Sequence, residues 1–134
     1  MPHIDPAPEN WAQFKALPRD TPINMLNLIK LRELAEYPEG HANHGKGLTG
    51  REAYAIYKAG IAPIVAASGG GMVWQQPLEC TVIGPPGEWD EAFVMGYPNS
   101  GAFLAMVKDP HYSADVVPHR TAAVADSRLI RFAG

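Results

Sequence analysis

The sequence predicts one α+β domain with an antiparallel sheet and the chain order β-α-β-β-α-β, which is typical of the ferredoxin-like fold. Two observations carry this prediction. Stretches that suit strands alternate with stretches of helical periodicity, and glycine or proline punctuates the chain between them. The expected strands are also apolar on both alternating sides, so each face of the sheet needs a cover. A chain of 134 residues is long enough for one such domain.

The N-terminal segment, residues 1–21, is predicted to be a proline-rich arm that lies over the domain formed by residues 22–134. A short helix is expected within the arm from Glu9 to Leu17, because apolar residues such as Trp11 and Phe14 then share one of its faces. We interpret the arm as part of the domain surface and not as a linker.

The clearest local pattern marks the start of a helix. After a predicted strand, Ile23 to Leu31, and a long polar connection, residues 32–48, the run Thr49-Gly50-Arg51-Glu52 forms a capping box. The helix is expected to continue to about Ala67 and to end at Gly69-Gly70-Gly71. The residues expected to face the sheet are Ala53, Ile56, Tyr57, Gly60, Ile61 and Ile64.

The second half of the domain supplies the remaining elements. Cys80 lies in an apolar alternating run and is expected to be buried and inert. Ser100 is predicted to cap the second helix, and Pro118 to interrupt the helical segment that follows. The expected elements are strands at Met72 to Ile83, Ala92 to Tyr97 and Arg128 to Phe132, a turn at Gly84-Pro85-Pro86-Gly87, and helices at Ser100 to Lys108 and Tyr112 to Ala125.

The two apolar faces of the sheet predict a homodimer. Leu26 and Leu28 alternate with the apolar residues of the other side of their strand, and Ala92 and Val94 do the same on theirs. Two helices can cover only one face of a four-stranded sheet, so the second face is expected to meet a second copy of the chain. The alternative is that the N-terminal arm alone covers that face.

Composition argues against several classes of partner. The formal net charge is −3 and the pI is near 5.9, which disfavours nucleic acid or an anionic membrane as a partner. The sequence has no recognisable signal peptide and no apolar run near the ~20 residues of a membrane span, so we expect a cytoplasmic protein. A single cysteine permits no internal disulfide.

Two glycine patterns resemble nucleotide-binding loops only in their letters. The run from Gly40 to Gly47 lacks the hydroxyl residue that should follow Lys46, and the run from Gly45 to Gly50 does not follow directly from a strand. His41 and His44 could contribute to a zinc site but lack further ligands nearby. We therefore expect no cofactor and no bound metal.

Several runs resemble the family called domain of unknown function 1330, and the resemblance covers about residues 22–134. It implies the dimeric α+β barrel superfamily, whose members include cofactor-independent monooxygenases of small aromatic compounds. The runs that carry it are Thr49-Gly50-Arg51-Glu52-Ala53-Tyr54, Gly69-Gly70-Gly71, Asp109-Pro110-His111-Tyr112, His119-Arg120-Thr121-Ala122 and Asp126-Ser127-Arg128-Leu129-Ile130.

A set of polar and aromatic residues is expected to line a pocket between the sheet and the helices. In this interpretation Arg120 binds a carboxylate or phenolate, and His119 or His111 moves a proton as a catalytic group. The alternative is structural, with Arg120 paired to Asp115 or Asp126. The remaining candidates for substrate binding are Asn27, Tyr57 and Trp74.

The sequence thus favours a dimeric barrel that binds a small organic molecule, partly aromatic or acidic. One alternative is a cofactor-independent enzyme that acts on such a molecule, of the monooxygenase, isomerase or decarboxylase type. Another is a stress or regulatory protein whose only partner is a second copy of itself.

Overall fold

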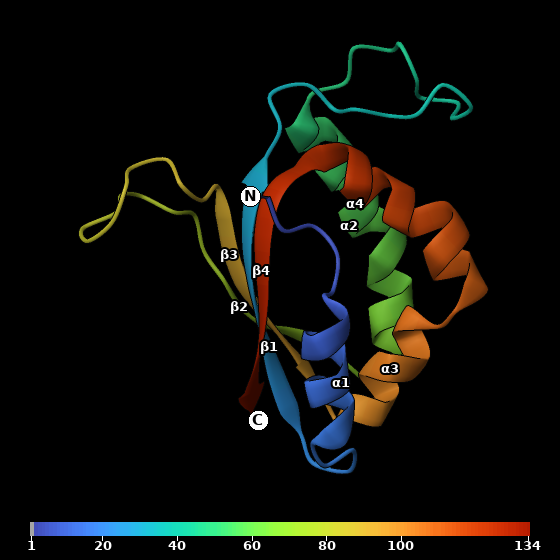
Figure 1. The fold of residues 1–134 in the computed structure, drawn as a ribbon, viewed down its shortest axis with the longest axis vertical. Coiled ribbons are helices and arrows are strands. Elements are labelled where there is room, and N and C mark those ends of the chain that lie inside the picture. Colours follow the sequence, from blue (N-terminus) through green and yellow to red (C-terminus); the bar gives the residue numbers. More distant parts are fainter. Residues whose placement is uncertain (1) are drawn as a thin grey trace.

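A four-stranded antiparallel sheet in the order β2-β3-β1-β4 forms one layer of the computed structural model, which describes residues 2–134 (Figure 1). The helices pack on one face of this sheet. The order of the strands and the helices along the chain confirms the predicted β-α-β-β-α-β pattern. The strands are β1 (Ile23–Leu31), β2 (Gly71–Gln75), β3 (Glu91–Tyr97) and β4 (Val124–Ala133). The helices are α1 (Pro8–Ala16), α2 (Gly50–Ala67), α3 (Ser100–Val107) and α4 (Val117–Ala123), with a π-helical turn, Tyr112–Val116, directly before α4. Among the described residues, no helix is long and apolar enough to cross a membrane.

The capping box at the start of α2 forms as predicted. The Glu52 backbone N–H donates to Thr49 Oγ1 over 3.0 Å, and the Thr49 N–H donates to Glu52 Oε1 over 3.0 Å. Gly50 is required between them, because a Cβ there would lie 2.0 Å from the Arg32 carbonyl oxygen. At the other end, Gly69 ends the helix with a φ of +83°, a conformation that favours glycine.

The buried stripe of α2 is rotated relative to the prediction. Ala53 and Tyr57 are buried as expected, but Ile56 is 39% exposed and Tyr54 is 2% exposed. The buried residues Gly50, Ala53, Tyr54, Tyr57 and Val65 follow the helical period of 3.6 residues, which turns Ile56 toward solvent.

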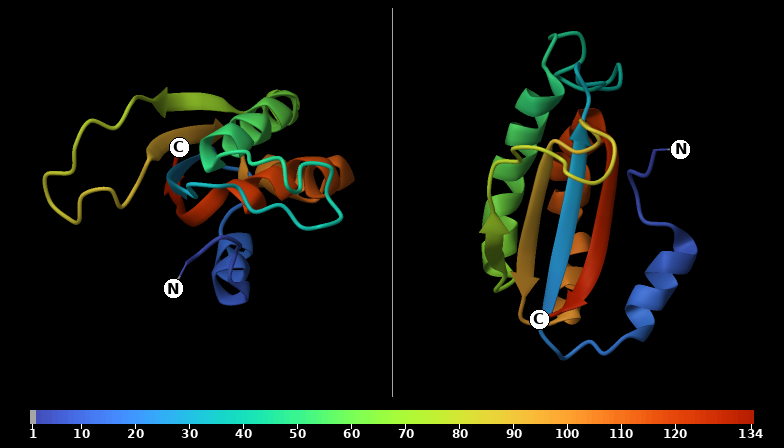
Figure 2. Two further views of the ribbon diagram at one scale, coloured as in Figure 1. Left: turned by 90° about the horizontal axis from the view of Figure 1, so that it is seen from above. Right: turned by 90° about the vertical axis from the view of Figure 1, so that its left-hand side faces the viewer.

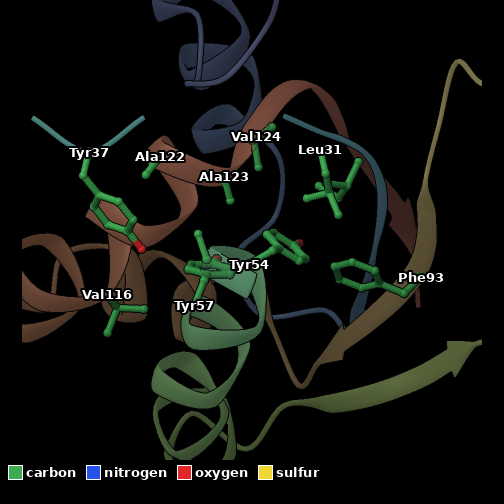
Figure 3. Close-up of a cluster of buried hydrophobic side chains, with 11 residues drawn as sticks. Leu31, Tyr37, Tyr54, Tyr57, Phe93, Val116, Ala122, Ala123 and Val124 are labelled. Atoms are coloured by element: carbon green, nitrogen blue, oxygen red, sulfur yellow. The ribbon is translucent and has the colours of Figure 1, made fainter. Parts of the chain in front are cut away.

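The core lies between the helices and the inner face of the sheet, which is the face toward α2. In one cluster, Tyr54 and Tyr57 of α2 pack near Leu31 and Phe93 of the sheet (Figure 3). A second cluster joins α1 and α3 to the same face, with Phe14 5.5 Å from Phe103 between ring centroids. The two clusters therefore bury most of the inner-face residues of β1 and β3.

The opposite face of the sheet, here called the open face, is apolar, as predicted. Leu26 of β1 is paired with Val94 on one side and Ile130 on the other, so the three side chains share this face. Ile130 is 42% exposed and Phe132 is 51% exposed. In the right-hand view of Figure 2 the strands face the viewer with no helix over them.

The alternative that the N-terminal arm covers the open face is wrong. Phe14 of α1 packs in the cluster that contains Met25 and Tyr97, which belong to the inner face. Arg131 also joins the arm from the inner side, because its Nη2 donates to the Pro18 carbonyl over 2.8 Å. The arm thus completes the helical layer and leaves the open face bare in the single chain.

The predicted second strand is too long, and β2 ends at Gln75 and not at Ile83. Its partner β3 begins only at Glu91, so residues 76–90 have no strand to pair with and form a projecting loop (Figure 1). Cys80 lies in this loop and is exposed, so the prediction of a buried thiol is wrong.

Three smaller differences concern the C-terminal half. The cap of α3 is Asn99 and not Ser100, since Asn99 Oδ1 accepts the Ala102 N–H over 2.8 Å. Pro118 does not interrupt the helical segment, because it lies in the first turn of α4, where no backbone donor is needed. The last strand begins at Val124, earlier than the predicted Arg128.

Candidate functional site

A cavity of about 950 Å³ lies between the inner face, α2, the segment from α3 to α4, and the N-terminal arm. The sheet contributes Met25, Phe93 and Met95, and α2 contributes Tyr57 and Ile61. These side chains make the walls mostly apolar and aromatic. A volume near this size suits a small organic molecule.

Three of the predicted site residues line this cavity: Asn27, Tyr57 and Arg120. The Asn27 amide donates to the Met25 carbonyl over 3.1 Å, and the Tyr57 hydroxyl lies 3.3 Å from that of Tyr112. The structure therefore brings together residues from β1, α2 and α4.

Arg120 is held by neutral acceptors. Its Nη1 donates to the Ile4 carbonyl over 2.6 Å and its Nη2 donates to Ser127 Oγ over 3.1 Å. The predicted structural partners are wrong, because Asp115 binds His111 and Asp126 binds Arg128. The guanidinium thus ties the start of the arm to β4.

The other three predicted residues do not line the cavity. Trp74 is paired with Val94, so it lies at the open face, and it is 48% exposed. His111 Nδ1 lies 2.8 Å from Asp115 Oδ2 on an exposed part of the helical layer. His119 also lies outside the cavity, next to Tyr37.

His119 packs against the long connection between β1 and α2. Its Nδ1 lies 2.7 Å from the Tyr37 hydroxyl, and its ring meets that of His41 edge-on at 5.3 Å. Burial, and then the neighbouring His41, lower the pKa of His119. Successive residues of a helix are about 100° apart, and on α4 Arg120 lines the cavity while His119 turns toward Tyr37 and His41.

Sequence reasoning missed several cavity residues, above all Tyr54 and Lys58. Lys58 forms an ion pair with Glu91, and its ammonium lies 5.2 Å from the centre of the Tyr54 ring. The period of α2 that buries Tyr57 also indicates Tyr54 and could have identified it. Tyr112 enters the site through the π-helical turn.

Three buried tyrosines of the site, Tyr54, Tyr57 and Tyr97, have raised pKa values. Burial raises the pKa of Tyr57, and the nearby Tyr112 raises it further. Burial also raises the pKa of Tyr54 and takes that of Tyr97 to about 12. Their hydroxyls are therefore hydrogen-bonding groups and not bases at neutral pH.

Positively charged side chains outnumber negatively charged ones among the residues that line the cavity. Arg120 and Arg131 line it, and neither takes part in any ion pair found among residues 2–134. Arg131 donates instead to the carbonyls of Phe14 and Pro18. Among the described residues that line the cavity, Asp5 is the only carboxylate. An anionic group would therefore be attracted into it.

Comparison with protein-family models gave no match, and comparison with curated proteins gave none either. Among solved structures, RPA0582 from Rhodopseudomonas palustris, a protein of unknown function, is 46% identical over 100% of this chain and 98% of its own, with a TM-score of 0.89. Methylated RPA0582 is 47% identical over 99% of this chain and 95% of its own, with the same TM-score of 0.89.

A more distant structure shows the fold alone. It is that of a dimeric protein of unknown function with a ferredoxin-like fold from Bacteroides fragilis, 12% identical over 87% of this chain and 100% of its own, with a TM-score of 0.51. The predicted ferredoxin-like fold is confirmed, and the chain belongs to the family of RPA0582 from Rhodopseudomonas palustris.

Proposed function

We propose that the chain forms a homodimer and binds a small organic acid with an apolar or aromatic body in the 950 Å³ cavity. The observation that carries the proposal is a largely apolar cavity lined by two arginines, Arg120 and Arg131, that form no ion pair with a carboxylate among the described residues. Buried or half-buried cations without counter-ions attract anions, and apolar walls select those with an apolar body.

The cavity offers separate regions for the two parts of such a molecule. Met25, Met95 and Phe93 supply soft and aromatic surface on the inner face. Arg120 of α4 also lines the cavity and donates to Ser127 of β4. An acid of this kind would place its body over the sheet and its charged group toward Arg120.

Two neutral groups can add specificity. The Tyr57 and Tyr112 hydroxyls are 3.3 Å apart, so one proton joins them and the other is free to donate to a ligand. The Asn27 amide has a second N–H and a carbonyl oxygen besides the N–H that meets the Met25 carbonyl. A ligand with a carbonyl or hydroxyl group in mid-chain would use both.

The homodimer is supported by the open face, which carries Leu26, Val94 and Ile130 and is uncovered in the single chain. The structural relative from Bacteroides fragilis is dimeric. Membership of the domain of unknown function 1330 family belongs to the same proposal and is supported by the sequence runs that resemble it.

The cavity supports binding more than proton transfer. Tyr54 and Tyr57 have raised pKa values, and His111 and His119, predicted to move a proton, lie outside the cavity. The alternative of a cofactor-independent enzyme would need turnover of the bound molecule. Mass spectrometry of a co-purified ligand, followed by incubation of that ligand with the protein, separates binding from turnover.

The cavity itself can be tested with the aromatic anion 8-anilinonaphthalene-1-sulfonate. Leu129 pairs with Asn27 on the inner face, lines the cavity and is 46% exposed, so Leu129→Trp should fill part of it and weaken binding of the probe at least tenfold. Ile130→Trp is the matched control, because it replaces an aliphatic side chain of the same strand by tryptophan on the open face. Equal affinity in the two variants would place the probe outside the cavity.

A further inference from the structure

The segment that precedes α1, residues 3–7 and here called the strap, forms one wall of the cavity. Three hydrogen bonds hold it. The His3 N–H donates to Asp126 Oδ1 over 2.8 Å, and Ser127 Oγ donates to the His3 carbonyl over 2.7 Å. The third is the bond from Arg120 to the Ile4 carbonyl.

The strap is attached in a way that permits release. Its partners are side chains at the junction of α4 and β4, although β4 is an edge strand whose free backbone groups could have paired with it. Pro6 lacks a backbone donor and cannot extend a ladder. Only Ile4 and Ala7 of the strap are partly buried, so the apolar contact that detachment breaks is mainly that of Ile4 with the core cluster near α2.

Arg120 connects the strap to the site. Its charge now meets a carbonyl and a hydroxyl, and a carboxylate or sulfonate is a stronger acceptor for a guanidinium than either. Ser127 Oγ accepts from Arg120 and donates to His3, so movement of the guanidinium also disturbs the second bond of the strap.

We propose that the strap is the gate of the cavity, and that an acidic ligand opens it by replacing the Ile4 carbonyl as the acceptor of Arg120. This inference rests on the proposed function, because it uses the same cavity. Ligand binding and strap release then favour each other, as linkage requires. In the empty protein, the Ile4 carbonyl occupies the position beside Arg120 that the ligand's anionic group takes in the complex.

The gate can be tested in the full chain with two variants at one position. His3→Pro removes the backbone N–H that binds Asp126, whereas His3→Ala removes the same imidazole and keeps the N–H. We expect 8-anilinonaphthalene-1-sulfonate to associate about tenfold faster with His3→Pro than with His3→Ala, the ratio that loss of one charge-assisted bond gives. Stopped-flow fluorescence measures both rates.

Equal association rates in the two variants, with the probe still excluded by Leu129→Trp, would overturn the gate and leave the proposed function standing. If Leu129→Trp binds the probe as well as the unmodified protein does, the proposed function fails and the gate fails with it. An independent measurement needs no variant. Hydrogen exchange of the His3 amide should become at least several-fold faster when the probe saturates the protein, and slower exchange would contradict release of the strap.

Discussion

The two faces of the sheet use neighbouring residues of the same strands and have different environments. On β1, Ile29 points to the inner face and is fully buried, while Leu28 points to the open face and is only partly buried. Both are large and aliphatic. The difference arises because the helices and the arm all pack on the inner side, and it shows that side-chain chemistry alone does not decide which face a chain covers.

The inner face itself has two parts that are held differently. Near α2, tightly packed side chains such as Tyr54, Ala123 and Val124 exclude solvent (Figure 3). Near β4, the cover is the strap, which three hydrogen bonds attach. Packing fixes the first part as core, whereas hydrogen bonds to a few side chains leave the second part able to open.

The largest effect is expected from a charge on the open face. Val94→Asp would bury a carboxylate in each subunit of the proposed dimer, and an uncompensated buried charge costs roughly 3–5 kcal/mol. The dimer should dissociate at micromolar concentration while the monomer stays folded. Light scattering with circular dichroism measures both. An unmodified protein that scatters as a monomer would contradict the dimer outright.

The inner face should be sensitive to a change that creates a cavity. Ile29→Ala removes a fully buried side chain and should lower the free energy of unfolding by about 2–5 kcal/mol. In the matched variant Leu28→Ala the free energy of unfolding of the monomer should decrease less. The main effect of this variant should be a weaker affinity between the subunits of the dimer. Urea unfolding of both variants, each in the Val94→Asp monomer, makes the comparison. Equal losses would show that the two faces are equally covered.

The weakly held part of the inner face can be examined through Arg120. Arg120→Met should weaken binding of 8-anilinonaphthalene-1-sulfonate tenfold or more, because a hydrogen bond to a charged group contributes about 1.5–3 kcal/mol. Arg120→Lys keeps the charge but lacks the planar fork of the guanidinium. Its affinity for the probe should lie between those of the unmodified protein and Arg120→Met. Fluorescence titration measures the affinities. Full binding by both variants would remove Arg120 from the site.

The smallest effect concerns the side of α4 that faces away from the cavity. The pKa of His119 is lowered in the folded protein, so the unfolded chain binds more protons as the pH falls below the ordinary value of 6.5. Stability should therefore decrease from pH 7.5 to pH 5.5, and less steeply in His119→Gln. Melting temperatures of the two proteins across this range measure the difference. Identical slopes would mean that His119, packed against Tyr37 and His41, titrates normally.

Local patterns in the sequence were sufficient where the interacting groups are close along the chain. The capping box spans only Thr49 to Glu52, and the alternation of β1 gives its bounds and both of its apolar faces. The length of β2 could not be obtained in this way. Its end depends on where β3 begins, and the apolar residues beyond Gln75, such as Val82 and Ile83, have no partner strand.

The sequence by itself determined the order of the elements, the two apolar faces and three of the residues that line the cavity. Only the tertiary structure decided that Arg120 meets Ile4, 116 residues away, and that Ser127 meets His3, 124 residues away. It also directed His119 away from Arg120. Periodicity reports which residues share a face of one element, but a cavity forms where several elements meet, and their separation is set by packing across the whole chain.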